Sequence, residues 1–180
     1  MTFSNPAGSA AASATAYVRA LLDVLGDRDP VDVLAELDGW LGRRLAGVTE
    51  AALRRPEAPG KWSVAEVVQH LADSDLVFGF RMRMILTEDR PAIQGYDQDQ
   101  WATTFRYSEV PLAEARAQLR VVRAGNLRVL RGLAAAELTR VGMHSERGPE
   151  SLAHLTKLMG AHDLVHRRQI DRVLKAAGVG

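Results

Sequence analysis

Residues 160–170, GAHDLVHRRQI, carry the pattern that decides both the fold and the chemistry expected of this chain. They lie in a longer segment, residues 151–177, whose hydrophobic period is near 3.6, so we predict one long helix there. His162 and His166 are four residues apart. That is about one helical turn, so both imidazoles project from the same face. This face also carries an apolar stripe, where two histidines without a binding partner would be costly to bury. Spacing and setting together favour a metal site inside a helical bundle.

A third histidine, His70, lies on a second predicted helix, which begins at Ser63 and runs to about Thr87. Ser63 and Glu66 match the capping box that starts many helices. His70 occupies an apolar face of this helix. If the two helices are neighbours, three neutral imidazoles can bind a divalent ion and leave one position open for water or substrate. Because binding requires neutral imidazoles, we expect metal occupancy to fall below the ordinary histidine pKa of about 6.5.

Each histidine taken alone also has an ordinary explanation. A helical His-x-x-x-His pair can arise by chance, and a single core histidine is more often hydrogen-bonded than metal-bound. The metal hypothesis is favoured because no acid faces the pair: Asp163 is expected about a quarter-turn away. Asp73 and Asp75, which follow His70, are expected to be solvated or to cap neighbouring groups.

The rest of the chain is also predicted to be helical. Further helices are expected at about residues 14–25, 30–48 and 111–133. Because no alternating β pattern is visible, the predicted fold class is all-α: a four-helix bundle preceded by an N-terminal helix. The long connection at residues 91–110 predicts a crossover between bundle helices. Residues 1–13, rich in Ala, Ser and Gly, predict a flexible tail, and residues 14–180 a single domain.

Composition excludes several classes of function. The 180 residues carry a net charge of only +1, with 23 basic and 22 acidic residues interspersed, so we expect no nucleic-acid and no membrane partner. The absence of cysteine excludes disulfides, thiolate metal ligands and a cysteine nucleophile. The N-terminal segment lacks the basic and apolar regions of a signal peptide, so a cytoplasmic location is expected.

Two segments resemble the metal-ligand segments of the DinB-like superfamily. Residues 60–72, GKWSVAEVVQHLA, are similar to the segment that carries the first ligand of that family, and residues 160–170 to the segment that carries the other two. Between them, Arg90-Pro91, residues 96–102 (YDQDQWA) and residues 144–148 (HSERG) also resemble the family. The similarity spans about residues 30–176.

The resemblance implies a four-helix bundle with a long crossover, often a homodimer. It implies a divalent metal, usually zinc or nickel, bound by His70, His162 and His166. Characterised members include transferases that depend on bacillithiol or mycothiol, so the implied chemistry is activation of a low-molecular-weight thiol cosubstrate, which suits a chain without cysteine. Two other functions stay open: a metal-dependent hydrolase that uses bound water, and a non-catalytic bundle that binds a metal or a small ligand.

Four side chains are candidates to line the entrance for a small-molecule substrate: Trp62, Tyr96, Trp101 and His144. His144 lies in a predicted loop, where a histidine is more often solvated.

The helix that begins at Ser63 is apolar nearly all round, with Leu76 and Phe80 away from the His70 face. A surface helix has a polar outer face, so we expect the crossover or a second subunit to cover these two side chains.

Overall fold

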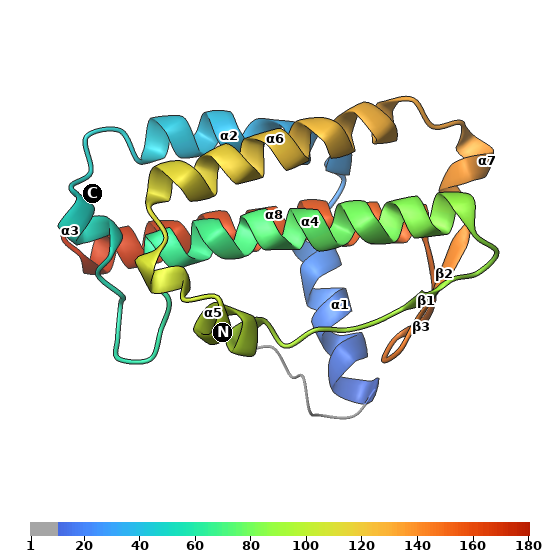
Figure 1. The fold of residues 1–180 in the computed structure, drawn as a ribbon, viewed down its shortest axis with the longest axis horizontal. Helices are drawn as coiled ribbons and strands as arrows, with labels where there is room; N and C mark the ends of the chain where they lie inside the picture. The colour runs from blue at the N-terminus through green and yellow to red at the C-terminus, as the bar shows by residue number, and fades with distance from the viewer. Residues whose placement is uncertain (1–10) are drawn as a thin grey trace.

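The computed structural model describes residues 11–180, in which four long helices form a bundle. They are α2 (Pro30–Arg44), α4 (Val64–Thr87), α6 (Leu112–Arg131) and α8 (Leu152–Ala176). Figure 1 shows that α4 and α6 run in one direction and α2 and α8 in the other. The predicted helical bundle is confirmed, and its order differs from a simple up-and-down series because α4 and α6 are parallel neighbours.

A long crossover makes this parallel pair possible. The chain leaves α4, returns along its whole length and enters α6 at the same end of the bundle at which α4 began (Figure 1). Two short helical elements lie in this connection, α5 (Gln98–Thr104) and the 3-10 turn η1 (Tyr107–Glu109), and the sequence pattern predicts neither. The side chain of Asp97 caps α5 by accepting the backbone N–H groups of Asp99 and Gln100.

The start of α4 agrees with the sequence. The backbone N–H of Ser63 donates to Oε2 of Glu66 at 2.8 Å, and the Ser63 hydroxyl accepts the backbone N–H of Glu66 at 3.4 Å. This capping box satisfies amide groups that would otherwise lack a partner at the helix end, and it sets the rotational phase from which His70 points inward.

Shorter and peripheral helices complete the helical part. α1 (Ala11–Leu25) packs across α8 and begins earlier than the predicted residue 14. Residues 1–10 of the predicted tail lie outside the described residues. α3 (Glu50–Leu53) and α7 (Ala135–Leu138) lie in the connections between bundle helices. None of the helices in residues 11–180 has both the length and the apolar character needed to cross a membrane.

The structure also contains a small sheet that the all-α prediction does not include. β2 (Val141–His144) and β3 (Gly148–Ser151) form an antiparallel pair, and β1 (Ala92–Ile93) from the crossover pairs with β2 in parallel. Strands of this length show no alternation that distinguishes them from loop in a sequence. The sheet ties the start of the crossover to the end of the bundle and places His144 in the interior.

The interior of the bundle is apolar at both ends and polar in the middle. One apolar cluster includes Leu41, Val67 and Ile170, and a second includes Met82 and Leu152. The residues between them along α4, α6 and α8 include histidine, arginine and aspartate side chains that are at most 8% exposed. Buried polar groups need partners, so this layer is where function is to be sought.

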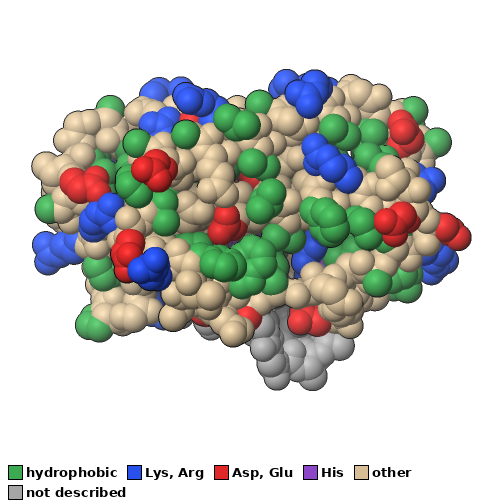
Figure 2. Space-filling view, viewed as in Figure 1, with side chains coloured by type: hydrophobic (Ala, Val, Ile, Leu, Met, Phe, Trp, Pro, Cys, Tyr) green, Lys and Arg blue, Asp and Glu red, His purple; other side chains and the backbone are tan. Residues whose placement is uncertain are grey.

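The crossover is one of the two segments expected to cover the outer face of α4, and it does not do so. Leu76 and Phe80 expose 52% and 64% of their surface, so the crossover does not cover them. Figure 2 shows hydrophobic side chains scattered along the middle of the face on which α4 lies. Cover by a second subunit stays a prediction.

Candidate metal centre

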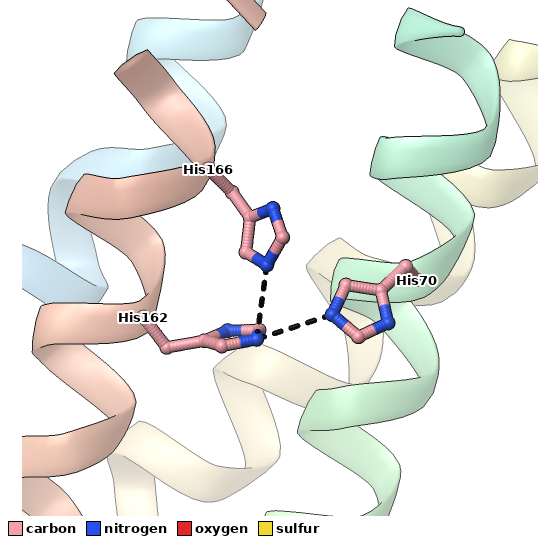
Figure 3. Close-up of side chains that lie close together, drawn as sticks. All are labelled: His70, His162 and His166. Atoms are coloured by element: carbon pink, nitrogen blue, oxygen red, sulfur yellow. Dashed lines mark hydrogen bonds between the residues drawn. The ribbon is translucent and has the colours of Figure 1, made fainter. Parts of the chain in front are cut away.

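Three histidines from two helices meet in the polar layer (Figure 3). Nε2 of His162 lies 3.1 Å from Nε2 of His70 on α4 and 3.0 Å from Nε2 of His166 on α8. The ligand nitrogens of the three lie within 4.8 Å of one another. The convergence expected from helical spacing is therefore present: α8 supplies two imidazoles from successive turns, and the neighbouring α4 supplies the third.

Hydrogen bonds among the three rings do not satisfy them. A neutral imidazole has one donor nitrogen and one acceptor nitrogen, so Nε2 of His162 can complete one regular bond, not two. Nδ1 of His70 and Nδ1 of His162 are also buried without a hydrogen-bond partner among the described residues. Nδ1 of His166 donates to Oε1 of Gln169 at 2.7 Å, which leaves Nε2 of that ring with a lone pair.

The arrangement fits a divalent ion. Metal–nitrogen bonds of about 2.0–2.1 Å in a tetrahedral site hold the nitrogens roughly 3.3 Å apart, close to the spacings in this cluster. The Gln169 contact is the kind of outer hydrogen bond that fixes the orientation of a ligating histidine.

The electrostatics also suit metal binding. Burial, and next the charge of Arg123, lowers the pKa of His162 to about 4. Burial and the neighbouring histidines lower the pKa values of His70 and His166 well below the ordinary value. All three rings are therefore neutral at neutral pH, as coordination requires. If the cluster binds a metal, we therefore expect its loss on acidification nearer pH 4 than the pH of 6.5 expected from the sequence.

Two of the predicted lining residues lie against the cluster. The Trp62 ring packs on the His70 ring with centroids 4.8 Å apart. Tyr96 reaches the cluster through Ser74, whose hydroxyl is 3.1 Å from the Tyr96 hydroxyl and 3.4 Å from Nε2 of His70. These hydroxyls place polar groups beside His70 in the lining of the smaller cavity.

Of the other two predicted lining residues, His144 lines the smaller of two cavities at the cluster and Trp101 lines neither. Trp101 packs on the Tyr96 ring at 4.5 Å and supports it. His144 is only 4% exposed, so the expectation that it is solvated is wrong. Its position in β2 buries it, and burial followed by the charge of Arg147 lowers its pKa to about 4.

Two cavities meet the histidine cluster. The larger, of about 1130 Å³, is an open groove that reaches His166 and is also lined by Trp62 and Gln169. The smaller, of about 160 Å³, reaches His162 and is also lined by Ser74 and Tyr96. The cluster is therefore accessible to small molecules from two sides.

A second buried polar cluster was not expected from the sequence. Arg123 on α6 donates to Asp75 Oδ2 at 2.7 Å, to Asp163 Oδ2 at 2.6 Å and to the carbonyl of Leu34 at 2.8 Å. The two aspartates are 0% exposed, and Arg123 thereby joins all four bundle helices. The expectation that Asp75 is solvated is wrong. It is also wrong for Asp73, which is 8% exposed and accepts the Tyr107 hydroxyl at 2.6 Å.

The charges of this Arg123 cluster balance one another in part. Burial raises the pKa values of Asp75 and Asp163, and Arg123 acts in the opposite direction. Burial also opposes the charge of Arg123, but the two aspartates outweigh it and raise the pKa of the guanidinium. One feature of the sequence could have indicated this cluster. Arg123 is a charged residue within the apolar stripe that Leu119, Leu127 and Leu130 form on α6.

Comparisons with known proteins show the family to which the chain is similar. A family model described as the DinB superfamily matches residues 40–170. A protein of Geobacillus thermodenitrificans named "Putative metal-dependent hydrolase" is 29% identical over 149 residues, which cover 82% of this chain and 84% of that protein. A Bacillus subtilis protein named "Putative metal-dependent hydrolase YfiT" is 38% identical over 72 residues, which cover 40% of this chain and 40% of that protein.

A solved structure is similar as well. The structure of YfiT from Bacillus subtilis, described as having an unusual four-helix bundle topology, matches with a TM-score of 0.77 and 26% sequence identity. The match covers 84% of this chain and 87% of YfiT.

Proposed function

This chain belongs to the DinB superfamily, and on that basis we propose that it is a metal-dependent enzyme with His70, His162 and His166 as the ligands. The observation that supports this most directly is the convergence of three Nε2 atoms that cannot satisfy one another. Three protein ligands leave a fourth position for a reacting molecule, which is the pattern of catalytic sites and not of closed structural ones.

The ion would be zinc or nickel, and when bound it would lower the pKa of a water or thiol at its open position. The residues of the chain supply the rest of the site. Gln169 holds the His166 ring in one tautomer and orientation. Trp62 covers one side of His70, and the paired hydroxyls of Ser74 and Tyr96 are positioned to donate a hydrogen bond to a molecule beside it.

We place thiol transfer first among the chemistries such a site can perform. Two cavities at the cluster allow a low-molecular-weight thiol and an electrophile to approach from different sides, whereas hydrolysis needs one organic substrate. The thiol would be of the bacillithiol or mycothiol kind that the family resemblance implies.

The acids nearest in sequence to His70 also favour a thiol. Glu66, which borders the larger cavity, is engaged in the Ser63 cap, and Asp73 accepts the Tyr107 hydroxyl. Neither is free to act as a general base for water. A thiol would have less need of such a base, because a bound metal would lower the thiol pKa enough for the proton to pass to solvent.

Hydrolysis by a bound water is the second candidate. The names of the relatives from Geobacillus thermodenitrificans and Bacillus subtilis favour it, since both describe a metal-dependent hydrolase. In this case the Ser74 and Tyr96 hydroxyls would orient the water or the leaving group.

One experiment separates these functions. Purified protein is loaded with cobalt(II), and its absorption spectrum is recorded before and after addition of mycothiol, bacillithiol or cysteine. We expect a sulfur-to-cobalt charge-transfer band, and thiol-dependent conjugation of a bromobimane electrophile. The His162→Ala variant should lose both, and the His154→Ala variant should keep both because His154 lies on the same helix outside the cluster.

Three results would contradict thiol transfer. If no thiol changes the spectrum while metal-loaded protein cleaves simple esters or amides, the enzyme is a hydrolase. If activity and stability are the same with and without a chelator, the site is not a metal centre. If His154→Ala abolishes conjugation and His162→Ala does not, the assigned ligands are wrong.

We also propose that two copies of the chain associate through the outer face of α4. The family resemblance implies a homodimer, and the exposed Leu76 and Phe80 are large apolar side chains on one helix. Sedimentation at micromolar concentration should show a dimer that Phe80→Glu converts to a monomer. A wild-type monomer would contradict the proposal.

A further inference from the structure

The smaller cavity contains a positive charge that the metal chemistry does not use. Arg81 lies on α4 and lines this cavity together with Ser74 and His162. Seven residues separate Ser74 from Arg81, which is about 10 Å along a helix, so the cavity extends from the histidine cluster along α4 to a guanidinium.

Arg81 forms no ion pair with a carboxylate among the described residues. One of its N–H groups donates to the carbonyl of Gln94, and the guanidinium lies over the Tyr96 ring at 5.9 Å. Among residues 11–180 no acid forms an ion pair with it, and residues 1–10 contain neither Asp nor Glu. Burial, and next Arg147, lowers its pKa. A partly buried guanidinium without a counter-ion is costly, so an anion would stabilise it.

The charged neighbours do not remove this charge. Arg147 also lines the cavity, but Glu150 holds it through two hydrogen bonds of 2.6 and 2.9 Å, so this pair is balanced internally. Glu146 is exposed and borders the cavity; its charge and that of Glu150 act to raise the pKa of Arg81, but neither carboxylate forms an ion pair with Arg81. Arg81 is therefore the guanidinium that remains free to bind an anion from solution.

The remaining wall shows what else the ligand must contain. Phe78, Leu155 and Met159 supply an apolar surface, and His144 and Tyr96 add polar edges. A volume of about 160 Å³ suits a small molecule with an apolar middle section and one charged end.

We propose that this cavity binds a small carboxylate-bearing substrate, with the carboxylate on Arg81 and the reactive group at the histidine cluster. A guanidinium matches a carboxylate with two parallel hydrogen bonds, which fixes both position and orientation. The inference rests on the proposed function only in calling the ligand a substrate; the binding itself requires no metal. Arg81 is thus assigned as the residue that selects the substrate.

Binding of two matched probes tests this. The affinities of hexanoate and of the uncharged hexanamide are measured by calorimetry at pH 7, on chelator-treated and on zinc-loaded protein. We expect hexanoate to bind chelator-treated protein at least tenfold more tightly than hexanamide. The Arg81→Gln variant should bind both equally, and Arg81→Lys should keep part of the preference. The matched control is Arg83→Gln, because Arg83 is on the same helix outside the cavity and should leave the preference unchanged.

The outcomes are distinguishable from those of the functional test. A preference for hexanoate that appears only with zinc, and persists in Arg81→Gln, would mean that the ion itself binds the carboxylate, and would overturn the proposal. Equal affinity of the two probes for wild-type protein would overturn it as well. Should Arg81→Gln fail to fold, the partial preference of Arg81→Lys carries the test. Failure of thiol transfer and hydrolysis alike would leave a hexanoate preference through Arg81 intact.

Discussion

The histidine cluster and the Arg123 cluster lie in the same buried layer but differ in how their polar atoms are satisfied. His162 and Asp163 are adjacent in the chain, project about 100° apart on α8, and belong to different clusters. The guanidinium of Arg123 is bonded to two carboxylates and a carbonyl, whereas two imidazole nitrogens of the other cluster have no partner among the described residues. A cluster that is complete within the chain fixes the packing, and an incomplete one depends on something that binds.

The largest expected effect is in the Arg123 cluster. Substitution Arg123→Met leaves two buried carboxylates without their cation, which should cost about 3–5 kcal/mol of unfolding free energy. Urea unfolding of metal-free protein measures the loss. Arg128→Met, an exposed change on the same helix, should cost less than about 0.5 kcal/mol. Equal effects of the two substitutions would mean that the Arg123 cluster does not fix the packing.

Acidification should act on the histidine cluster with a predictable sign. In metal-free protein the pKa of His162 is about 4, below the unfolded value of 6.5. Between these values the unfolded chain binds the proton and the folded chain does not, so stability is lost as pH falls from 6.5 to 4. For this one residue the loss is about 3 kcal/mol.

The measurement is the difference between wild type and His162→Ala across that pH range, which cancels contributions common to both proteins. The aspartates of the Arg123 cluster respond oppositely: their pKa values are raised, so acidification relieves their burial. A pH-independent difference would indicate that His162 is not held neutral.

Zinc should stabilise one cluster only. At a concentration one hundred times its dissociation constant, zinc should raise the unfolding free energy of wild-type protein by about 2.7 kcal/mol. Thermal unfolding with and without zinc measures the gain. His162→Ala should abolish it, whereas the gain should survive in His154→Ala. A gain retained in His162→Ala would place the zinc elsewhere.

The smallest expected effect concerns the outer bond to His166. Gln169→Ala removes the acceptor for Nδ1 and should weaken metal binding roughly 10- to 100-fold, as loss of an outer hydrogen bond does. Competition with a chromophoric chelator measures the affinity. Gln169→Glu, which keeps an acceptor oxygen, should restore most of it; no change in either variant would show that Gln169 has no positioning role.

Helical periodicity predicts directions well, and this explains what could be predicted here. The four-residue spacing of His162 and His166, and the apolar face of His70, suffice to place all three toward the interior. The same geometry correctly turns Asp163 away from the pair. Periodicity does not report what lies in that other direction, and there Asp163 meets Arg123 from a helix 40 residues away in the chain.

The missed features depend on contacts between distant segments. Asp75 is buried because Arg123 reaches it across the bundle, which no local pattern reveals. His144 is interior because β1, from the crossover, pairs with the strand that contains it. Pairings of this kind join segments whose own patterns are too short to identify them as strands.

The bundle helices and the crossover contribute different parts of the candidate site. The candidate metal ligands lie on bundle helices, where a change would disturb the packing, but Tyr96 and Gln98 of the smaller cavity belong to the connection between α4 and α6. Exposed connections accept substitutions and insertions more readily than packed helices do. A change in this connection can therefore alter what the smaller cavity accepts without altering the candidate metal ligands or the helices that hold them.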